Sequence, residues 1–209
     1  MTKRKIQESI EISLTDFINF VNKTGNNKLT VVKQVKHRVD YDPFTDFYKP
    51  IREKIQQIHK KGGVKSDLDS IINTLKDEKK KINYPTIITG YKKFWGRKNI
   101  KWFKPPYKKW FVGDISIRLN PELGLEYDNR FYVIKLYFKE ESIKRAYVNQ
   151  ILTLMEYQLR KKLNEPEVIF ALLDIRKGKM YTKEGNKLDE LPLLLGEAKS
   201  FEEIWKNIE

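Results

Sequence analysis

The sequence of 209 residues contains no cysteine and only two histidines, His37 and His59. Without cysteine the protein has no disulfide scaffold, no cysteine-ligated zinc site, no thiol nucleophile and no iron–sulfur cluster. Two histidines also exclude a metal centre built from several imidazole groups. Any metal chemistry is therefore restricted to carboxylate ligands.

Long apolar segments are missing as well. The longest, such as Val168–Leu173 and Leu191–Leu195, are far shorter than the roughly 20 residues of a membrane-spanning helix. The basic N-terminal segment lacks the apolar stretch of a secretory signal, so we expect a cytoplasmic protein without a membrane partner. No glycine spacing matches a phosphate-cradling loop, which argues against an ATP or dinucleotide site.

The sequence is rich in positive charge, with 42 lysines and arginines against 28 acidic residues. The segment Lys76–Trp110 holds twelve of these cations, two acids and eight aromatic residues. Cations neutralise phosphates and flat rings stack on unpaired bases, so this mixture predicts a DNA or RNA partner. The residues expected to contact nucleic acid are Lys92, Lys93, Trp95, Arg97, Lys98, Lys101, Trp102, Lys104, Lys108 and Lys109.

Other interpretations of this basic segment remain open. Lysine outnumbers arginine 33 to 9, a bias that is also typical of a solvated basic face. An anionic protein or membrane surface is a further alternative, and the aromatic residues are equally suited to a hydrophobic core. The sequence distinguishes neither DNA from RNA nor one oligomeric state from another.

Apolar residues at helical spacing dominate the region 1–105. Ser13 and Asp16 are typical of a capping-box start, and proline is favoured in the first turn of a helix. We therefore expect a helical, basic and aromatic-rich N-terminal region that packs on the rest of the chain. The helices expected there begin at Ser13, Thr30, Pro50, Ser66 and Pro85.

After Pro105-Pro106 the apolar period changes to two, which indicates strands. The region 106–209 is expected to form an α/β core: a mixed β-sheet of four to five strands flanked by helices. Together with the N-terminal region it would form one compact unit. The expected strands are Trp110–Leu119, Glu122–Tyr127, Arg130–Lys139, Val168–Ile175 and Lys179–Thr182, with a long helix over Ser142–Leu163 and a short final helix from Ser200.

Asp128-Asn129 is a two-residue turn signal that sets the register of a hairpin. If these two residues form the turn, the numbers of paired residues sum to 257. Glu122 then faces Lys135 across the ladder, with Val133, Tyr137 and Lys139 on the same face of the second strand. One carboxylate and one lysine are therefore predicted neighbours.

The order of elements, together with Pro121-Glu122 and the triplets Val133-Ile134-Lys135 and Tyr137-Phe138-Lys139, resembles the core of the PD-(D/E)XK nuclease superfamily. In that superfamily two carboxylates bind Mg²⁺ and a lysine positions or activates the attacking water. The resemblance implies catalytic roles for Glu122, Lys135 and Lys139, with Mg²⁺ at Glu122. Asn120–Leu125 and Ile134–Lys139 are also similar to bacterial proteins of unknown function.

The chain departs from the superfamily pattern where Val133 or Tyr137 stands in place of the second acid. Asp114 and Glu126 are candidates to replace that metal ligand, and Glu156 is a third. Two interpretations follow: a nucleic-acid-binding protein that cleaves phosphodiesters with Mg²⁺, or a non-catalytic accessory or protein-interaction protein of the same fold.

Overall fold

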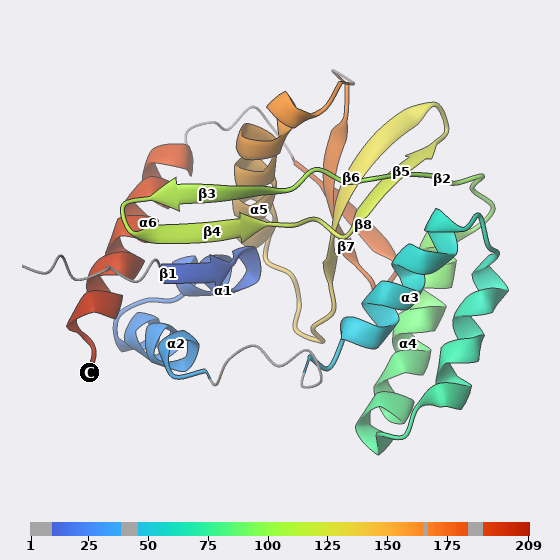
Figure 1. Ribbon diagram of the computed structural model, residues 1–209, viewed down its shortest axis with the longest axis horizontal. Coiled ribbons are helices and arrows are strands. Elements are labelled where there is room, and N and C mark those ends of the chain that lie inside the picture. Colours follow the sequence, from blue (N-terminus) through green and yellow to red (C-terminus); the bar gives the residue numbers. More distant parts are fainter. Residues whose placement is uncertain (1–9, 39–45, 165–166, 184–189) are drawn as a thin grey trace, which may run out of the picture.

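The computed structural model describes residues 10–38, 46–164, 167–183 and 190–209. Helices flank two mixed sheets, one of three strands and one of five, which confirms the predicted α/β class (Figure 1). Within the described ranges no helix is long and apolar enough to cross a membrane. The elements are β1 (Ile10–Ser13), α1 (Leu14–Val21), α2 (Asn26–Lys36), α3 (Lys49–Lys60), the 3₁₀ helix η1 (Lys65–Thr74), α4 (Glu78–Trp95), β2 (Lys101–Phe103), β3 (Lys108–Val112), β4 (Ile115–Leu119), β5 (Leu123–Tyr127), β6 (Arg130–Tyr137), α5 (Arg145–Leu159), the 3₁₀ turn η2 (Arg160–Lys162), β7 (Ile169–Asp174), β8 (Lys179–Thr182) and α6 (Glu190–Asn207).

The five-stranded sheet has the order β2-β5-β6-β7-β8. Its β5–β6 hairpin has the predicted register, with Leu123 opposite Ile134 and Tyr127 opposite Arg130. Asp128 and Asn129 both have positive φ, 50° and 56°, as a two-residue turn of the primed type requires. Helix α5 then crosses over the sheet, so that β7 runs parallel to β6.

Hydrophobic cores lie on both faces of this sheet. Val133 and Tyr137 of β6 belong to a core shared with α1, α5, α6 and the three-stranded sheet. The alternate residues Ile134 and Leu136 face a second core, built with α3, η1 and α4. Elements before and after residue 105 therefore share the same cores.

The three-stranded sheet, of order β1-β4-β3, differs from expectation. Trp110–Leu119 was expected to be one strand, but Gly113, with φ of 59°, and Asp114 turn the chain between β3 and β4. The apolar alternation shifts by one residue at this turn, because Val112 and Ile115 pair with each other and both face the core. That shift is the sequence signal of the hairpin.

Several helix boundaries also correct the expectation. Helix α4 begins after Asp77, whose carboxylate accepts from the backbone N–H of Lys80, and Pro85 lies inside this helix. Ser200 does not start the last helix, since α6 already begins at Glu190. The strands β1 and β2 were not expected, because each has only three or four residues.

His59 is buried between α3 and α4, where its Nε2 lies 2.5 Å from the hydroxyl of Tyr91. Burial lowers the pKa of His59 to about 4. In the unfolded chain the imidazole titrates near 6.5, so the unfolded state takes up a proton first as the pH falls. The stabilising contribution of neutral His59 is therefore complete above pH 6.5 and is lost between pH 6.5 and 4.

We expect the wild-type free energy of unfolding to fall by roughly 3 kcal/mol across this pH window through His59 alone. Urea titrations from pH 4 to 7.5 measure it. The His59→Gln variant should lose this component of the pH dependence, whereas His37→Gln, at an exposed position, should keep it. Equal pH profiles for wild type and His59→Gln would contradict the assignment.

Candidate functional site

Glu122 and Lys135 form a buried ion pair at the point where β5 begins. Lys135 Nζ lies 2.5 Å from Glu122 Oε1, and both residues are only 7 % exposed. The backbone N–H of Leu136 donates to Glu122 Oε2 at 2.7 Å. The side chain of Gln56, on α3, donates to the Glu122 carbonyl at 2.8 Å and ties that helix to the pair. The predicted contact across the hairpin is confirmed.

The ion pair borders a cleft of about 400 Å³ between the N-terminal end of α1, helix α3 and the β4–β5 connection. Four cations from four separate parts of the fold reach this cleft: one follows α2, and the others lie on α3, β4 and β6. They are Arg38, Arg52, Arg118 and Lys135. The other lining residues are Ser13, Thr15, Asp16, Asp46, Gln56, Asn120, Pro121 and Glu122.

Carboxylates orient two of the arginines. Arg38 donates to both oxygens of Asp16, at 2.9 and 3.1 Å, and this hydrogen bonding raises the pKa of Arg38. Asp16 sits in the first turn of α1, where its backbone N–H donates to Ser13 Oγ. Arg52 donates to Asp46 at 2.8 Å. The two guanidinium groups are therefore held in place at the cleft by carboxylates.

A second cavity of about 190 Å³ adjoins the cleft and shares Arg52, Glu122 and Lys135 with it. Its walls include Tyr147 of α5, whose pKa is raised by burial. Lys139, predicted as a catalytic residue, is exposed beyond the end of β6 and lines this cavity. The three predicted catalytic residues therefore line the cleft or the adjoining cavity, and Lys139 lies at the edge of that cavity.

The other predicted metal ligands lie away from Glu122. Asp114 is at the opposite end of β4, where it pairs with Lys206 at 2.7 Å. Glu126 is four residues along the strand, about 13 Å away, and pairs with Lys101 at 3.0 Å. Glu156 of α5, the third candidate, pairs with Arg160, the first residue of η2. The structure does not bring these carboxylates together.

The donor set around Glu122 does not fit Mg²⁺. The Lys135 ammonium already neutralises this carboxylate, and both carboxylate oxygens accept hydrogen bonds from the protein. Val133 and Tyr137, the two candidates for the position of the superfamily's second acid, are both buried in the hydrophobic core. No group of three or more histidine, aspartate or glutamate side chains able to hold a metal ion occurs in the part of the chain that the structure describes.

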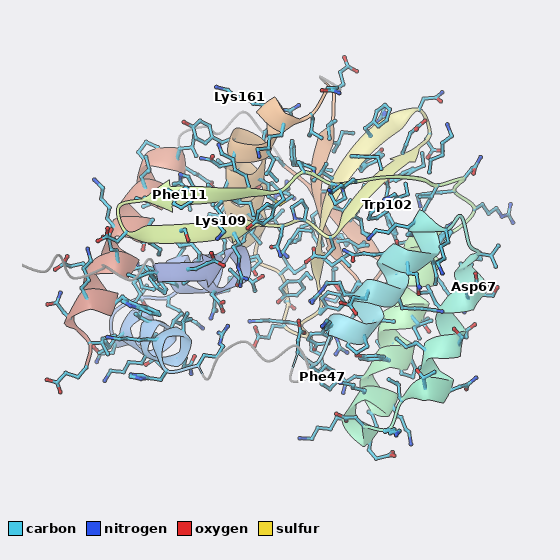
Figure 2. All side chains as sticks on the ribbon, viewed as in Figure 1. Phe47, Asp67, Trp102, Lys109, Phe111 and Lys161 are labelled. Atoms are coloured by element: carbon cyan, nitrogen blue, oxygen red, sulfur yellow. The ribbon has the colours of Figure 1, made fainter. Side chains whose placement is uncertain are left out.

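The basic segment does not form one continuous surface. Its first part lies on α4, on the connection that carries Arg97 and Lys98, and on β2 of the five-stranded sheet, which includes Trp102. Lys109 lies on β3 of the other sheet (Figure 2). Trp95 packs on the ring of His59, and Trp102 lies beneath Lys60, so both are half-buried.

Most lysines of the segment have partners within the protein. Lys92 pairs with Asp69, Lys101 with Glu126, Lys108 with Gln158 and Lys109 with Glu11, while Lys98 donates to the carbonyl of Phe94. The side chains of Lys93, Arg97 and Lys104 are exposed and form no ion pair or hydrogen bond with the residues that the structure describes.

The arginines and aspartates of the cleft were missed by sequence reasoning. Arg38 and Arg118 are 80 residues apart in the chain, and no motif links them. In a comparison with known proteins, the chain matches no family model, and no curated protein matches it significantly. The functional argument therefore rests on the geometry of the cleft.

Proposed function

We propose that the protein binds nucleic acid through its sugar–phosphate backbone in the cleft lined by Arg38, Arg52, Arg118 and Lys135, without metal-dependent cleavage. The observation that carries this proposal is the convergence of these four cations on one concave surface. Guanidinium groups match the geometry of phosphate oxygens and bind them in a bidentate manner. The net charge of +14 adds long-range attraction for a polyanion.

The ion pairs of the cleft are compatible with phosphate binding. A guanidinium group has five N–H donors, so an arginine that holds a carboxylate with one edge can offer another edge to phosphate. Arg38 keeps about half of its side chain exposed while it contacts Asp16. The neighbouring carboxylates thus fix the direction of the arginines before the ligand arrives.

The topology supports a nuclease-like core for this binding protein. Within the five-stranded sheet, helix α4 precedes β2, the β5–β6 hairpin comes after the excursion of β3 and β4 into the other sheet, and α5 leads to the parallel strand β7. In such a core, Glu122 and Lys135 would correspond to the superfamily acid and lysine. With Val133 in place of the second acid, we assign the pair a structural role at the floor of the cleft. We also propose that the protein is cytoplasmic.

Two triple variants of equal net charge test the proposal. One is Arg38→Gln, Arg52→Gln and Arg118→Gln, in the cleft. The other is Lys93→Gln, Arg97→Gln and Lys104→Gln, in the basic segment. By fluorescence anisotropy with labelled oligonucleotides, the cleft variant should bind at least tenfold more weakly. Its slope of log K against log salt should fall by about 2–3, because three phosphate contacts are lost.

The basic-segment variant should keep affinity within about threefold of wild type. Equal losses in both triple variants would show that only net charge matters and would contradict the cleft assignment. Thermal unfolding of each variant checks the fold, and Arg38→Gln alone, at a half-exposed side chain, repeats the test with little risk to stability. Incubation with Mg²⁺ or Mn²⁺ should leave the labelled strands intact. Metal-dependent cleavage by the wild-type protein would instead support a nuclease.

A further inference from the structure

Strand β3 exposes a large aromatic side chain on the face of the three-stranded sheet that points away from the core. Phe111 is 68 % exposed, whereas its neighbours Trp110 and Val112 are buried. Side chains alternate along a strand, so Lys109 lies on the same outward face as Phe111. Tyr107, just before β3, is 49 % exposed and lies close enough to Lys109 to interact with it electrostatically.

The outward face is continuous with the cleft. Lys109 is directly opposite Arg118 in the β3–β4 ladder, and paired residues project to the same side of a sheet. Arg118 in turn lines the cleft. Phe111 lies two residues further along β3, about 7 Å from Lys109. Figure 2 labels Phe111 and Lys109 next to each other on this strand.

The cations on this face are held in place from the neighbouring strand. Glu11 of β1 pairs with Lys109 and lies 3.5 Å from the Nε of Arg118. In Figure 1 the helices α5 and α6 lie behind the three-stranded sheet, on its core side. The face therefore presents the ring of Phe111 and two fixed cations on the β3–β4 strand pair, with Tyr107 just before β3.

We infer that this face binds unpaired bases, so that the ligand is a single-stranded nucleic acid whose backbone continues into the cleft. The inference rests on the proposed function and specifies its substrate. Aromatic rings beside a basic groove are the arrangement by which proteins bind single strands, with bases stacking on the rings. Lys109 and Arg118 share the single acid Glu11, so the face keeps an excess of positive charge, which favours a polyanion over an apolar protein partner.

The test uses Phe111→Ala and Tyr107→Ala, with Tyr157→Ala as a matched control on α5. Tyr157 is 53 % exposed and lies outside both the cleft and this face. The probes are a labelled 12-nucleotide single strand, the corresponding duplex and inorganic polyphosphate. Phe111→Ala should weaken single-strand binding about tenfold and leave duplex and polyphosphate binding unchanged. Phe111→Trp should retain wild-type affinity, and Tyr157→Ala should have no effect.

The outcomes separate this inference from the proposed function. If the cleft triple variant loses affinity while Phe111→Ala and Tyr107→Ala bind the single strand like wild type, the stacking face is wrong and the cleft stands. If the wild type binds none of the three probes, the proposed function itself fails. Equal loss of duplex and single-strand binding in Phe111→Ala would also overturn base stacking.

Discussion

Glu122→Ala is expected to lower the free energy of unfolding by about 3–5 kcal/mol at pH 7. The substitution leaves the Lys135 ammonium, which is only 7 % exposed, without its carboxylate partner. It also removes the acceptor of the Leu136 backbone N–H. A buried charge and a buried donor without partners each carry a large desolvation cost. Urea denaturation followed by circular dichroism measures the loss.

The double variant Glu122→Leu with Lys135→Met is the control for this prediction. It replaces both charges with apolar side chains of similar volume, which for other buried ion pairs is close to neutral or stabilising. We therefore expect it to recover most of the stability lost in Glu122→Ala. If Glu122→Ala is as stable as the wild type, water must reach the Glu122–Lys135 pair freely, and the prediction is wrong.

Val133→Asp is expected to destabilise the protein by about 4 kcal/mol or more at pH 7. The substitution recreates the acid-x-lysine triplet, but Val133 has no exposed surface and packs in the core with α1 and α5. A carboxylate at this position would be removed from water without a cation or hydrogen-bond donor to compensate for the loss of hydration. Thermal and urea unfolding both report the loss.

Val133→Asn separates the effect of charge from that of shape, since the amide has nearly the same volume as the carboxylate. It should cost less than Val133→Asp, and the difference should shrink as the pH is lowered and the carboxylate is protonated. A Val133→Asp variant with wild-type stability, and with a melting temperature that Mg²⁺ raises, would place this position in open solvent. The site would then be suited to a metal.

The hairpin and its ion pair could be predicted because they depend on local information. A two-residue turn at Asp128-Asn129 determines the pairing of every residue in the two strands, including Glu122 with Lys135. The long amphipathic helix was recognised for the same reason, and the buried strand after it from its continuous apolar run. Periodicity over ten or more residues needs no knowledge of distant segments.

The cleft could not be predicted because its cations come from segments that only the tertiary fold brings together. Arg38, Arg52 and Arg118 are isolated in sequence, and each is surrounded by residues with no shared pattern. The division of the basic segment between two sheets could not be predicted for the opposite reason. Its charges are close in sequence, but the chain leaves the five-stranded sheet after β2 and joins the three-stranded sheet at β3.

Arginine footprinting tests the central claim most directly. The chain has nine arginines, so modification with an arginine-specific dicarbonyl reagent can be followed at every site by mass spectrometry. We predict that a saturating single-stranded oligonucleotide protects Arg38, Arg52 and Arg118, while Arg97 and Arg130 react as they do in the free protein. Protection of Arg97 with unchanged reactivity at the three cleft arginines would contradict the account.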